Sequence, residues 1–424
     1  MVVSHRNLVN AVNSYLFQLN NIPITPKDRY IGYLPLAHVL ELIAENMMLV
    51  FGIGIGYSSP NTLTDKSTMI RTGGKGDATI LKPTVMAAVP LVLERIYKGI
   101  HLNVKKKGEF FEKLFDFCVR YKVAATARGE VTPIMDKLIF KGVTQLIGGS
   151  LRVIFTGGAP LSPETHEYIK ACMCCPLLQG YGLTETAACV TVMGMDENST
   201  GRVGPPCQGI RIRLENWEEG NYRVTDEPRP RGEIVIGGAN ITEGYYKLPG
   251  KTNEDYFFDE GLRWFRSGDI GQMEEDGTLR VIDRKKDLVK LQFGEYVSLG
   301  KVESVLKTNC LVENICIYAD SSKSHVVALL CPDRINLHIL ATSLGLGTKD
   351  FAELCLDKDL VGAVLKELVQ TGRQQNLAKF ELPGAVTLCQ EMWTPEGGLV
   401  TAAFKLKRKP LQHFYQKSID VMYG

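Results

Sequence analysis

Eight residues in the middle of the chain bring glycines, an aromatic ring, a hydroxyl and a carboxylate close together. They are residues 179–186, Gln-Gly-Tyr-Gly-Leu-Thr-Glu-Thr. Gly180 and Gly182 let the backbone approach a ligand, and Tyr181 offers a flat apolar face. The Thr184 hydroxyl can hydrogen-bond a phosphate oxygen, and the Glu185 carboxylate can hold a hard cation such as Mg²⁺. The stretch is a candidate nucleotide site, and the alternative is a glycine-rich turn before a helix.

The residues before this stretch predict a strand, a helix and a second strand. Residues 151–155 form a short β-rich run, and a glycine-rich loop follows at 156–160. The Ser-Pro-Glu sequence at 162–164 is typical of a helix start, and that helix should continue to about Cys172. Residues 176–179 predict the second, buried strand. In an open parallel sheet, loops at the carboxyl ends of the strands face the ligand crevice.

The two glycine-rich loops together resemble the signature of the adenylate-forming acyl-CoA synthetases and ligases. This resemblance implies two steps: a carboxylate attacks the α-phosphate of ATP to give an acyl-adenylate and pyrophosphate, and a thiol then displaces AMP. It places nucleotide contacts at Gly157, Gly158, Ala159, Gln179, Gly180, Tyr181 and Gly182. It gives Thr184 and Glu185 catalytic roles, with Glu185 also holding the Mg²⁺ ion.

The composition is that of a globular protein with more than one domain. The chain has 424 residues, of which 45% are hydrophobic and 23% charged, and domains typically contain about 100–200 residues. Forty-nine basic and 47 acidic residues give a formal charge of +2. The overall charge therefore gives no indication of a nucleic-acid partner.

Eleven cysteines, an odd number without framework-like spacing, indicate free thiols in a reducing compartment. Cys172, Cys174 and Cys175 lack a second ligand group at zinc spacing, so we interpret them as buried or incidental thiols. The most apolar run, residues 47–57, is shorter than the roughly 20 residues of a membrane-spanning helix. We expect it to be a buried, strand-like core segment.

Residues 1–8 resemble the segment that in this family directly follows a phosphate loop ending in Pro-Lys-Gly. We therefore expect this chain to lack the family's N-terminal part, including that loop and any membrane anchor. On this hypothesis the full-length parent is an active ligase and the present chain is weakly active or inactive. Residues 72–77 lack Walker spacing and are better interpreted as a surface turn.

Three segments in the first half have both a structural and a functional interpretation. His38, after the apolar run Leu-Pro-Leu-Ala, is commonly a satisfied core residue, whereas the resemblance implies a pocket-lining or gating role. Residues 88–98 resemble a segment that borders the acyl tunnel in the long-chain branch, and the alternative is an ordinary amphipathic helix. The helical, Lys-rich stretch 100–145 reads as a solvated insertion, and membrane contact through Lys105–Lys107 is the less favoured alternative.

A hairpin is predicted around Asp276 and Gly277, since Asp-Gly is a strong signal for a two-residue loop. That loop places Glu275 opposite Thr278 and, further along, Asp269 opposite Arg284. A structural ion pair is one interpretation. In the family that the chain resembles, the aspartate accepts hydrogen bonds from both ribose hydroxyls and the arginine steadies ribose and phosphate, and we favour this functional interpretation.

The resemblance divides the chain into residues 1–283, the remainder of the large AMP-binding and acyl-binding domain, and residues 284–424, a mobile C-terminal lid. Lys286 matches the hinge position, with a charged linker as the alternative, and Gly294 matches the glycine that approaches the pantetheine arm of CoA. Lys405 matches the catalytic lysine, whose ammonium group stabilises negative charge in the adenylation step. Phe404 stands where many relatives have glycine.

The expected fold is therefore α/β, with layered sheets and flanking helices in the large domain and a small α+β lid. The resemblance covers residues 1–424 and is closest to the long-chain fatty acid synthetases, especially the arachidonate-preferring subgroup. It implies a long-chain fatty acid, ATP and CoA as substrates. It also implies peripheral association with the cytosolic face of a membrane (endoplasmic reticulum, mitochondrial outer membrane, peroxisome or lipid droplet), although this chain alone could be soluble.

Two other classes of function remain open. One is a noncatalytic paralogue or isoform that binds nucleotide or a partner. The other is an adenylating enzyme that passes its acyl group to oxygen or to a carrier protein.

Overall fold

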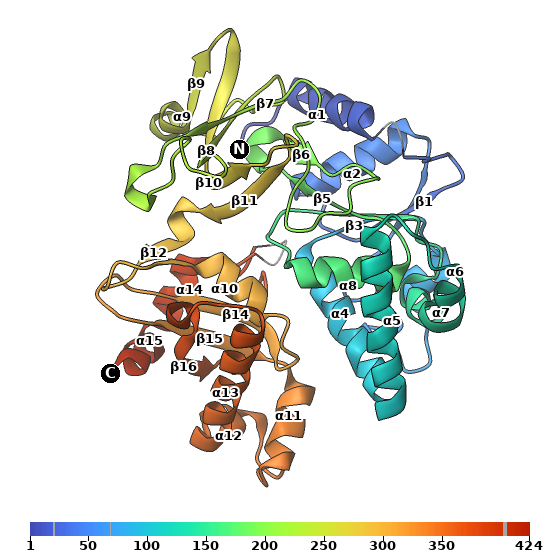
Figure 1. Cartoon of the computed structure of the whole chain (residues 1–424), viewed down its shortest axis with the longest axis vertical. Helices are drawn as coiled ribbons and strands as arrows, with labels where there is room; N and C mark the ends of the chain where they lie inside the picture. Colours follow the sequence, from blue (N-terminus) through green and yellow to red (C-terminus); the bar gives the residue numbers. More distant parts are fainter. Residues whose placement is uncertain (20–21, 68, 402–404) are drawn as a thin grey trace. The chain divides into compact units, whose positions relative to one another are not determined.

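The computed structural model describes residues 1–19, 22–67, 69–401 and 405–424. The chain divides into two compact units, Met1–Ile282 and Asp283–Gly424 (Figure 1). The roles expected for the two units, a large substrate-binding domain and a mobile lid, stay predictions.

A six-stranded sheet with the order β2-β1-β3-β4-β5-β6 forms the centre of the first unit. Its strands are β1 (Arg29–Gly32), β2 (Gly54–Tyr57), β3 (Val85–Ala88), β4 (Val153–Thr156), β5 (Leu177–Tyr181) and β6 (Thr191–Val192). Neighbouring strands from β2 to β5 are parallel, and only β6 pairs antiparallel, with β5. The loops after β1, β3, β4 and β5 therefore emerge at one edge of the sheet.

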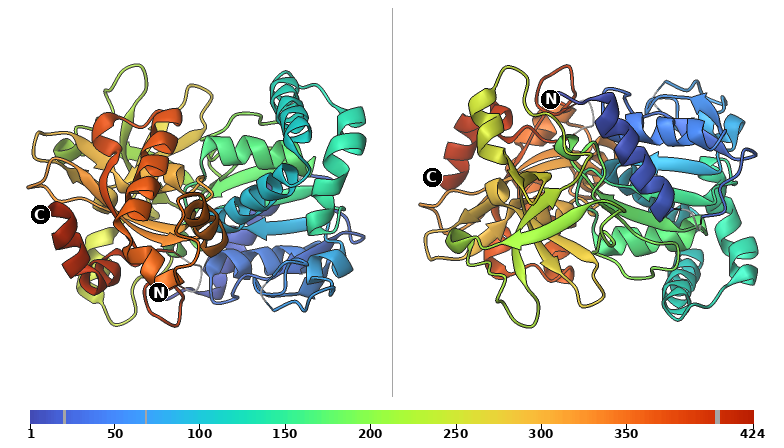
Figure 2. Two further views of the ribbon diagram at one scale, coloured as in Figure 1. Left: turned by 90° about the horizontal axis from the view of Figure 1, so that it is seen from below. Right: turned by 90° about the horizontal axis from the view of Figure 1, so that it is seen from above.

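Helices cover both faces of this sheet. They are α1 (His5–Gln18), α2 (Val39–Val50), α3 (Asp77–Leu81), α4 (Pro90–Lys105), α5 (Glu109–Ala127), α6 (Pro133–Met135), a π-helical turn (Asp136–Phe140), α7 (Lys141–Thr144) and α8 (Pro163–Met173). Tyr30 packs with Val12 of α1 and Ile43 of α2, whereas the next residue, Ile31, packs with Leu93 of α4. This alternation follows from the two-residue period of a strand. Figure 2, in the view from above, shows α1 lying across the strands.

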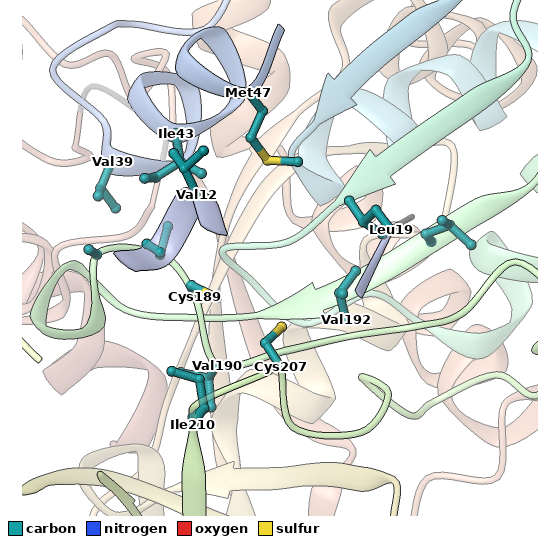
Figure 3. Close-up of a cluster of buried hydrophobic side chains, with 14 of the residues drawn as sticks. Val12, Leu19, Val39, Ile43, Met47, Cys189, Val190, Val192, Cys207 and Ile210 are labelled. Atoms are coloured by element: carbon teal, nitrogen blue, oxygen red, sulfur yellow. The ribbon is translucent and has the colours of Figure 1, made fainter. Parts of the chain in front are cut away.

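Figure 3 shows the first of these two cores, in which Val12 and Ile43 face the segment that carries Cys189 and Val190. All of these side chains are nearly inaccessible to solvent. The helices α1 and α2 therefore support, from one side, the segment that follows the glycine-rich stretch 179–186.

The predicted strand, helix and strand between residues 151 and 179 are confirmed. The α8 helix begins at Pro163 after the N-cap Ser162, whose hydroxyl accepts a hydrogen bond from the Thr165 N–H. The β4 and β5 strands on either side of it are parallel neighbours. A serine cap followed by proline at the first helical position started this helix, as expected.

Two sequence interpretations are wrong. Residues 47–57 are not one buried strand: residues 47–50 end α2, and β2 begins at Gly54 on the partly exposed edge of the sheet. The apolar residues of α2 recur at helical rather than strand spacing, which decides for the helix. The stretch 100–145 is not merely a solvated insertion, because Phe115 and Phe140 are fully buried with ring centroids 5.4 Å apart.

A second sheet in the first unit is antiparallel. Its strands are β7 (Arg211–Glu215), β8 (Arg231–Gly237), β9 (Tyr256–Asp259), β10 (Leu262–Met273) and β11 (Leu279–Arg284), with α9 (Pro249–Asp255) before β9. The order is β11-β10-β8-β7, and β9 pairs with β10.

The hairpin between β10 and β11 has a different register from the predicted one. The Gly277 N–H donates to the Glu274 carbonyl (3.0 Å), and the Glu274 N–H donates to the Thr278 carbonyl (2.9 Å). Glu274, not Glu275, therefore faces Thr278 across a three-residue loop. Gly277 adopts a left-handed conformation (φ +79°), which closes a type I turn with one residue more than the expected two-residue loop.

The second unit is a small α+β structure. Its elements are β12 (Leu288–Lys290), β13 (Tyr296–Ser298), α10 (Leu299–Leu306), β14 (Val312–Tyr318), β15 (Val326–Pro332), α11 (Arg334–Ser343), α12 (Phe351–Leu356), α13 (Lys358–Gln374), β16 (Pro383–Leu388), α14 (Arg408–Phe414) and α15 (Gln416–Tyr423). The β14-β15-β16 sheet packs against α10 and α13 through residues such as Leu306, Ile315, Ala328 and Leu368. This confirms the α+β class expected here.

Two further expectations concern cysteines and membranes. All eleven cysteines are free thiols, as predicted. Among the helices of the described residues, none has the length and apolar character needed to cross a bilayer.

Candidate functional site

The glycine-rich loops after β4 and β5 lie side by side at the carboxyl edge of the parallel strands. A Cβ atom on Gly157 would lie 3.0 Å from the carbonyl oxygen of Gly180, which is closer than side chains normally approach. The first loop therefore needs glycine where it meets the second, whereas a Cβ atom on Gly180 would lie 3.1 Å from the carbonyl oxygen of Thr191 in β6. The strand-helix-strand pattern predicted that both loops lie at the carboxyl ends of parallel strands, and the parallel pairing of β4 and β5 confirms it.

Tyr181 joins the second loop to the antiparallel sheet. Its hydroxyl donates a hydrogen bond of 2.7 Å to the Asp269 carboxylate. Asp269 is buried and lies in a bulge of β10, where residues 267–269 stand opposite the single residue Ile234 of β8. Bulges re-aim side chains, and this one leaves the Asp269 carboxylate beside Tyr181.

The bulge has its own hydrogen bonds. The Ser267 hydroxyl donates to the Ile234 carbonyl (2.6 Å), and the Asp269 N–H donates to the Ser267 hydroxyl (3.0 Å). The Gly268 N–H donates to the Glu233 carboxylate (3.0 Å), with Gly268 in a left-handed conformation. The Ser-Gly-Asp sequence thus fixes the backbone from which the Asp269 side chain projects.

The loop that carries Thr184 and Glu185 is a single 3₁₀ turn, Thr184–Thr186. Gly182 has no room for a side chain, because a Cβ atom there would collide with the backbone of Ala188. The buried Asn240 amide donates to the carbonyls of Thr186 (2.7 Å) and Cys189 (2.6 Å). The loop is therefore held from both ends, with the Thr184 side chain exposed and Glu185 partly exposed.

Glu185 receives a hydrogen bond that sequence reasoning did not predict. The Tyr245 hydroxyl lies 3.0 Å from a Glu185 carboxylate oxygen and 3.0 Å from an oxygen of Asp255. Lys251 pairs with the same Asp255 oxygen at 3.1 Å. Burial, and then the negative charge of Glu185, raise the pKa of Tyr245, so its hydroxyl stays protonated and donates.

The first residues of the chain lie beside the same region. The Val2 N–H donates to the Gly244 carbonyl (2.8 Å), and the Asn7 amide donates to the Ile241 carbonyl (2.8 Å). The Thr242 N–H in turn donates to the Glu185 carbonyl (2.9 Å). Segments from three distant parts of the sequence therefore position Glu185.

Two buried polar atoms at the edge of the site have no hydrogen-bond partner among the described residues. They are the Gln179 side-chain carbonyl oxygen and the Thr156 hydroxyl, which belong to paired residues, Thr156 at the end of β4 and Gln179 in the middle of β5. A buried polar atom without a partner is costly and is often satisfied by a ligand or water. These atoms, the backbone cradle at Gly157 and Gly180, and the Asp269 carboxylate fit a ligand rich in hydroxyl and amino groups, such as a nucleoside.

The donor set for a metal ion is small. Among the described residues there is no cluster of three or more His, Cys, Asp or Glu side chains that could hold a metal. Glu185 fits a cation such as Mg²⁺ only as one ligand among others, which is how Mg²⁺ is commonly bound together with phosphate oxygens and water.

His38 has a structural role. It is the N-cap of α2, and its Nδ1 accepts a hydrogen bond of 3.2 Å from the Leu40 N–H. His38 follows β1 at the same edge of the sheet as the glycine-rich loops. Its gating role stays a prediction.

Four of the predicted site residues belong to the second unit. Arg284 and Lys286 are exposed and flank its first residues, and Gly294 takes a left-handed conformation (φ +97°) in the turn between β12 and β13. The predicted juxtaposition of Arg284 with Asp269 depended on the two-residue loop and stays a prediction. Phe404 lies outside the described residues.

Lys405 lies in a hairpin that Arg408 anchors. The Lys405 N–H donates to the Thr401 hydroxyl (3.1 Å) and its carbonyl accepts from the Thr401 N–H (2.8 Å). Arg408 forms two hydrogen bonds with Glu303 (2.6 and 2.9 Å) and one with Asp287 (2.7 Å). The Glu303 and Asp287 carboxylates hold the pKa of Arg408 above its ordinary value. Arg408 thus connects the Lys405 segment to the residue that follows Lys286.

Comparison with known proteins places the fold and the family. The chain is 45% identical to long chain acyl-CoA synthetase 8 of Arabidopsis thaliana, across 100% of this chain and 60% of that protein. It is 36% identical to the peroxisomal long chain acyl-CoA synthetase 6 of the same plant, across 100% of this chain and 58% of that protein. The chain thus spans about 60% of the length of these curated relatives.

Solved structures share this fold. The A domain of carboxylic acid reductase from Segniliparus rugosus, in complex with AMP and a co-purified carboxylic acid, superimposes with a TM-score of 0.72 at 24% identity. The match covers 97% of this chain and 58% of that one. Residues 1–246, which include both glycine-rich loops and Tyr245, match the family of AMP-binding enzymes. The chain belongs to the AMP-binding enzyme family.

Proposed function

We propose that this protein activates long-chain fatty acids to acyl-CoA thioesters in an ATP-dependent reaction. The acid forms an acyl-adenylate and pyrophosphate, and the CoA thiol then releases AMP. The observation that carries the proposal is the hydrogen bond between Tyr181 and Asp269, which joins the glycine-rich loop to the Ser-Gly-Asp bulge. The names of the curated relatives support the acyl substrate class.

The nucleotide is proposed to lie along the carboxyl edge of the six-stranded sheet. Gly157, Gly158, Ala159, Gln179, Gly180, Tyr181 and Gly182 would contact it. Asp269 accepts a hydrogen bond from Tyr181, and we propose that its carboxylate also binds the ribose hydroxyls, since an ionised carboxylate is an acceptor for several donors. The unpartnered Gln179 oxygen suits an amino group of the base.

Thr184 and Glu185 are proposed to act at the phosphates. The exposed Thr184 hydroxyl is free of steric cover and can donate to a phosphate oxygen. Glu185 would hold a Mg²⁺ ion, which offsets negative charge on the phosphates when bound. Tyr245 orients the Glu185 carboxylate for this purpose, so we assign it a positioning role.

The second unit is proposed to act as a lid that turns about Lys286. Lys405 would supply an ammonium group that stabilises the charge developed when the carboxylate attacks phosphorus. Arg284 would steady the ribose and phosphate, Gly294 would leave room for the pantetheine arm of CoA, and His38 would gate the acyl pocket. The anchoring of the Lys405 hairpin by Arg408 supports a tail that moves together with its unit.

The acyl specificity and the compartment are the finer parts of the proposal. An arachidonate-type preference, peripheral membrane association and a place on the cytosolic face of a membrane follow from the resemblance. One curated relative is named as peroxisomal, which supports an organelle surface without selecting among organelles.

The direct test is acid-dependent exchange of pyrophosphate into ATP, measured with a panel of carboxylic acids and followed by acyl-CoA formation. We expect long-chain acids to support both reactions, and Lys405→Ala and Asp269→Asn to lower exchange by more than tenfold. Lys407→Ala is the matched control for Lys405→Ala, because both lysines are exposed on the same hairpin.

Other outcomes would identify the other classes. Exchange without CoA consumption would indicate an oxygen or carrier-protein acceptor. Nucleotide binding without exchange, unchanged in Lys405→Ala and Glu185→Ala, would identify a noncatalytic nucleotide-binding protein.

A further inference from the structure

The α5 helix presents an apolar stripe to solvent. Phe110, Leu114, Phe117 and Tyr121 recur at spacings of four, three and four residues, which places them on one helix face. All four are exposed, Phe110 by 82% and Phe117 by 57%. Large aromatic side chains exposed together on one face commonly mark an interaction site.

This stripe is not the face by which α5 joins the core. A different set of α5 residues, including Phe115, Cys118 and Val119, is buried in the cluster shared with α4 and α8. Figure 1 shows α5 beside α4 and α8. The helix therefore carries two apolar faces, and folding of the first unit uses one of them.

Basic residues border the exposed stripe. Lys105, Lys106 and Lys107 are exposed immediately before α5. On a helix with 3.6 residues per turn, Lys113 and Arg120 lie at the edge of the stripe, and Glu112 and Asp116 lie farther round. Lys113 is paired with Glu109 at 2.6 Å, in an exposed position. The positive charge next to the stripe therefore comes mainly from the lysine triplet and Arg120.

A second exposed apolar group follows in the chain. It comprises Val131, Ile134 and Leu138, with Lys137 and Lys141 exposed among them. The π-helical turn that carries Leu138 is attached to α5 by the ion pair of Lys122 with Asp136 and by the packing of Phe140 on Phe115. From residue 105 to residue 141 the sequence has nine basic and five acidic residues, a net charge of +4 against +2 for the whole chain.

We propose that the exposed stripe of α5, defined by Phe110, Leu114, Phe117 and Tyr121, docks onto a bilayer that contains anionic lipid. An exposed apolar helix face bordered by lysine and arginine suits the interfacial region, where the apolar side chains enter between headgroups and the cations face anionic phosphates. A protein partner would be expected to bury fewer lysines at the interface core. The inference rests on the membrane association in the proposed function and names the surface responsible for it.

The test is co-sedimentation of the whole protein with vesicles, without nucleotide. One set of vesicles is phosphatidylcholine, and the other also contains phosphatidylserine. We expect binding to the anionic vesicles that weakens with salt, and at least a tenfold loss of binding in the double variant Phe110→Ser and Phe117→Ser. Ile335→Ser with Ile339→Ser is the matched control, because these isoleucines are also exposed four residues apart on a helix, α11.

A second variant separates charge from apolar insertion. Replacing Lys105, Lys106 and Lys107 by Gln should reduce binding to the anionic vesicles and leave weak binding to phosphatidylcholine unchanged. Binding of the Phe110→Ser and Phe117→Ser variant at the wild-type level would overturn the proposal. So would lipid-free self-association that this variant abolishes, because the face would then bind a second copy of the chain.

Pyrophosphate exchange, measured on the same variants in detergent, keeps the two proposals apart. We expect exchange to be unchanged in the α5 variants. Vesicle binding by a protein that shows no exchange, both as the present chain and in a version extended at its N-terminus, would refute the proposed ligase activity and retain the docking surface.

Discussion

The phenolic hydroxyl of Tyr181 donates a hydrogen bond of 2.7 Å to the carboxylate of Asp269, 88 residues further along the chain. The bond connects the last residue of a parallel strand with a bulge in an antiparallel one. It orients a buried carboxylate without neutralising it, since Tyr181 supplies a dipole rather than a charge.

Removal of the Tyr181 hydroxyl should weaken nucleotide binding while the ring remains. We expect Tyr181→Phe to lower the affinity for AMP by about tenfold, since hydrogen bonds to charged groups contribute roughly 1.5–3 kcal/mol and 1.4 kcal/mol is a factor of ten. Calorimetric titration with AMP measures this change. Tyr246→Phe, at an exposed tyrosine, is the control, and unchanged affinity in Tyr181→Phe would mean that Asp269 needs no orientation.

The Tyr245 hydroxyl should control the metal requirement. We expect Tyr245→Phe to raise the Mg²⁺ concentration for half-maximal exchange by about tenfold, as the loss of a partner of a metal ligand commonly does. The KM for the fatty acid should stay the same, because Tyr245 contacts Glu185 and Asp255 only through its hydroxyl. Steady-state kinetics with varied Mg²⁺ tests this, and an equal change in both constants would point to general damage. Tyr246→Phe again serves as control.

Loss of Arg408 should destabilise the second unit. Arg408→Met removes the cation that pairs with Glu303 and Asp287. We expect the free energy of unfolding to fall by about 2 kcal/mol, which is less than the loss for a fully buried ion pair because Arg408 is partly exposed. Urea denaturation measures the loss. The exposed neighbour Lys409 provides the control Lys409→Met, which should change stability by less than about 0.5 kcal/mol. Equal stability of the two variants would contradict the anchoring role.

Glu41 should make stability decrease with rising pH. This carboxyl is fully buried and accepts from Tyr30 at 3.0 Å, and burial, together with the charge of Glu45, raises its pKa to about 8. Between about pH 4.5 and about pH 8 the folded protein keeps a proton that the unfolded chain releases, so the free energy of unfolding falls across this range.

Glu41→Gln should remove that loss and stabilise the protein at about pH 8 by on the order of 2–4 kcal/mol relative to wild type. Urea denaturation at about pH 5 and about pH 8 measures the change. Glu254→Gln, at an exposed position, should leave the pH dependence as it is. The assignment would be contradicted if, relative to Glu41→Gln, the wild-type protein gained stability between about pH 5 and about pH 8.

The part of the site formed by residues close together in the sequence, the two loops on either side of α8, could be predicted from local patterns. The cap at Ser162 and the apolar runs on either side of α8 predicted the parallel pair β4 and β5, and with it the two loops at the same edge of the sheet. The glycines and the strand pattern lie within a few residues of one another there, so no distant contact was needed.

The errors arose where a choice depended on one torsion angle or on packing. A left-handed Gly277 is compatible with a two-residue or a three-residue loop, and the hydrogen bonds at Glu274 selected the longer one. The apolar run 47–57 is divided between the end of the α2 helix and the edge strand β2. The helical spacing of the apolar residues before residue 47 indicates that the first part of the run continues the helix.

Contacts between distant residues were beyond such reasoning. Tyr245 lies 60 residues from Glu185, and Arg408 lies 105 residues from Glu303. The Gly-Tyr-Tyr-Lys sequence at 244–247 holds two neighbouring tyrosines, but sequence order does not indicate which hydroxyl meets which carboxylate. Only the fold brings the segment between β8 and α9, which carries Tyr245, against the 184–186 turn.

The two hydrogen bonds of Asn240 to the carbonyls of Thr186 and Cys189 have a consequence for the thermodynamics of binding. They order the turn that carries Glu185 during folding, so nucleotide association loses little backbone conformational entropy at this turn. When the turn is already ordered, the favourable binding enthalpy is offset by a smaller loss of conformational entropy. Calorimetry should therefore show a more unfavourable entropy of AMP binding for Asn240→Ala than for the wild-type protein.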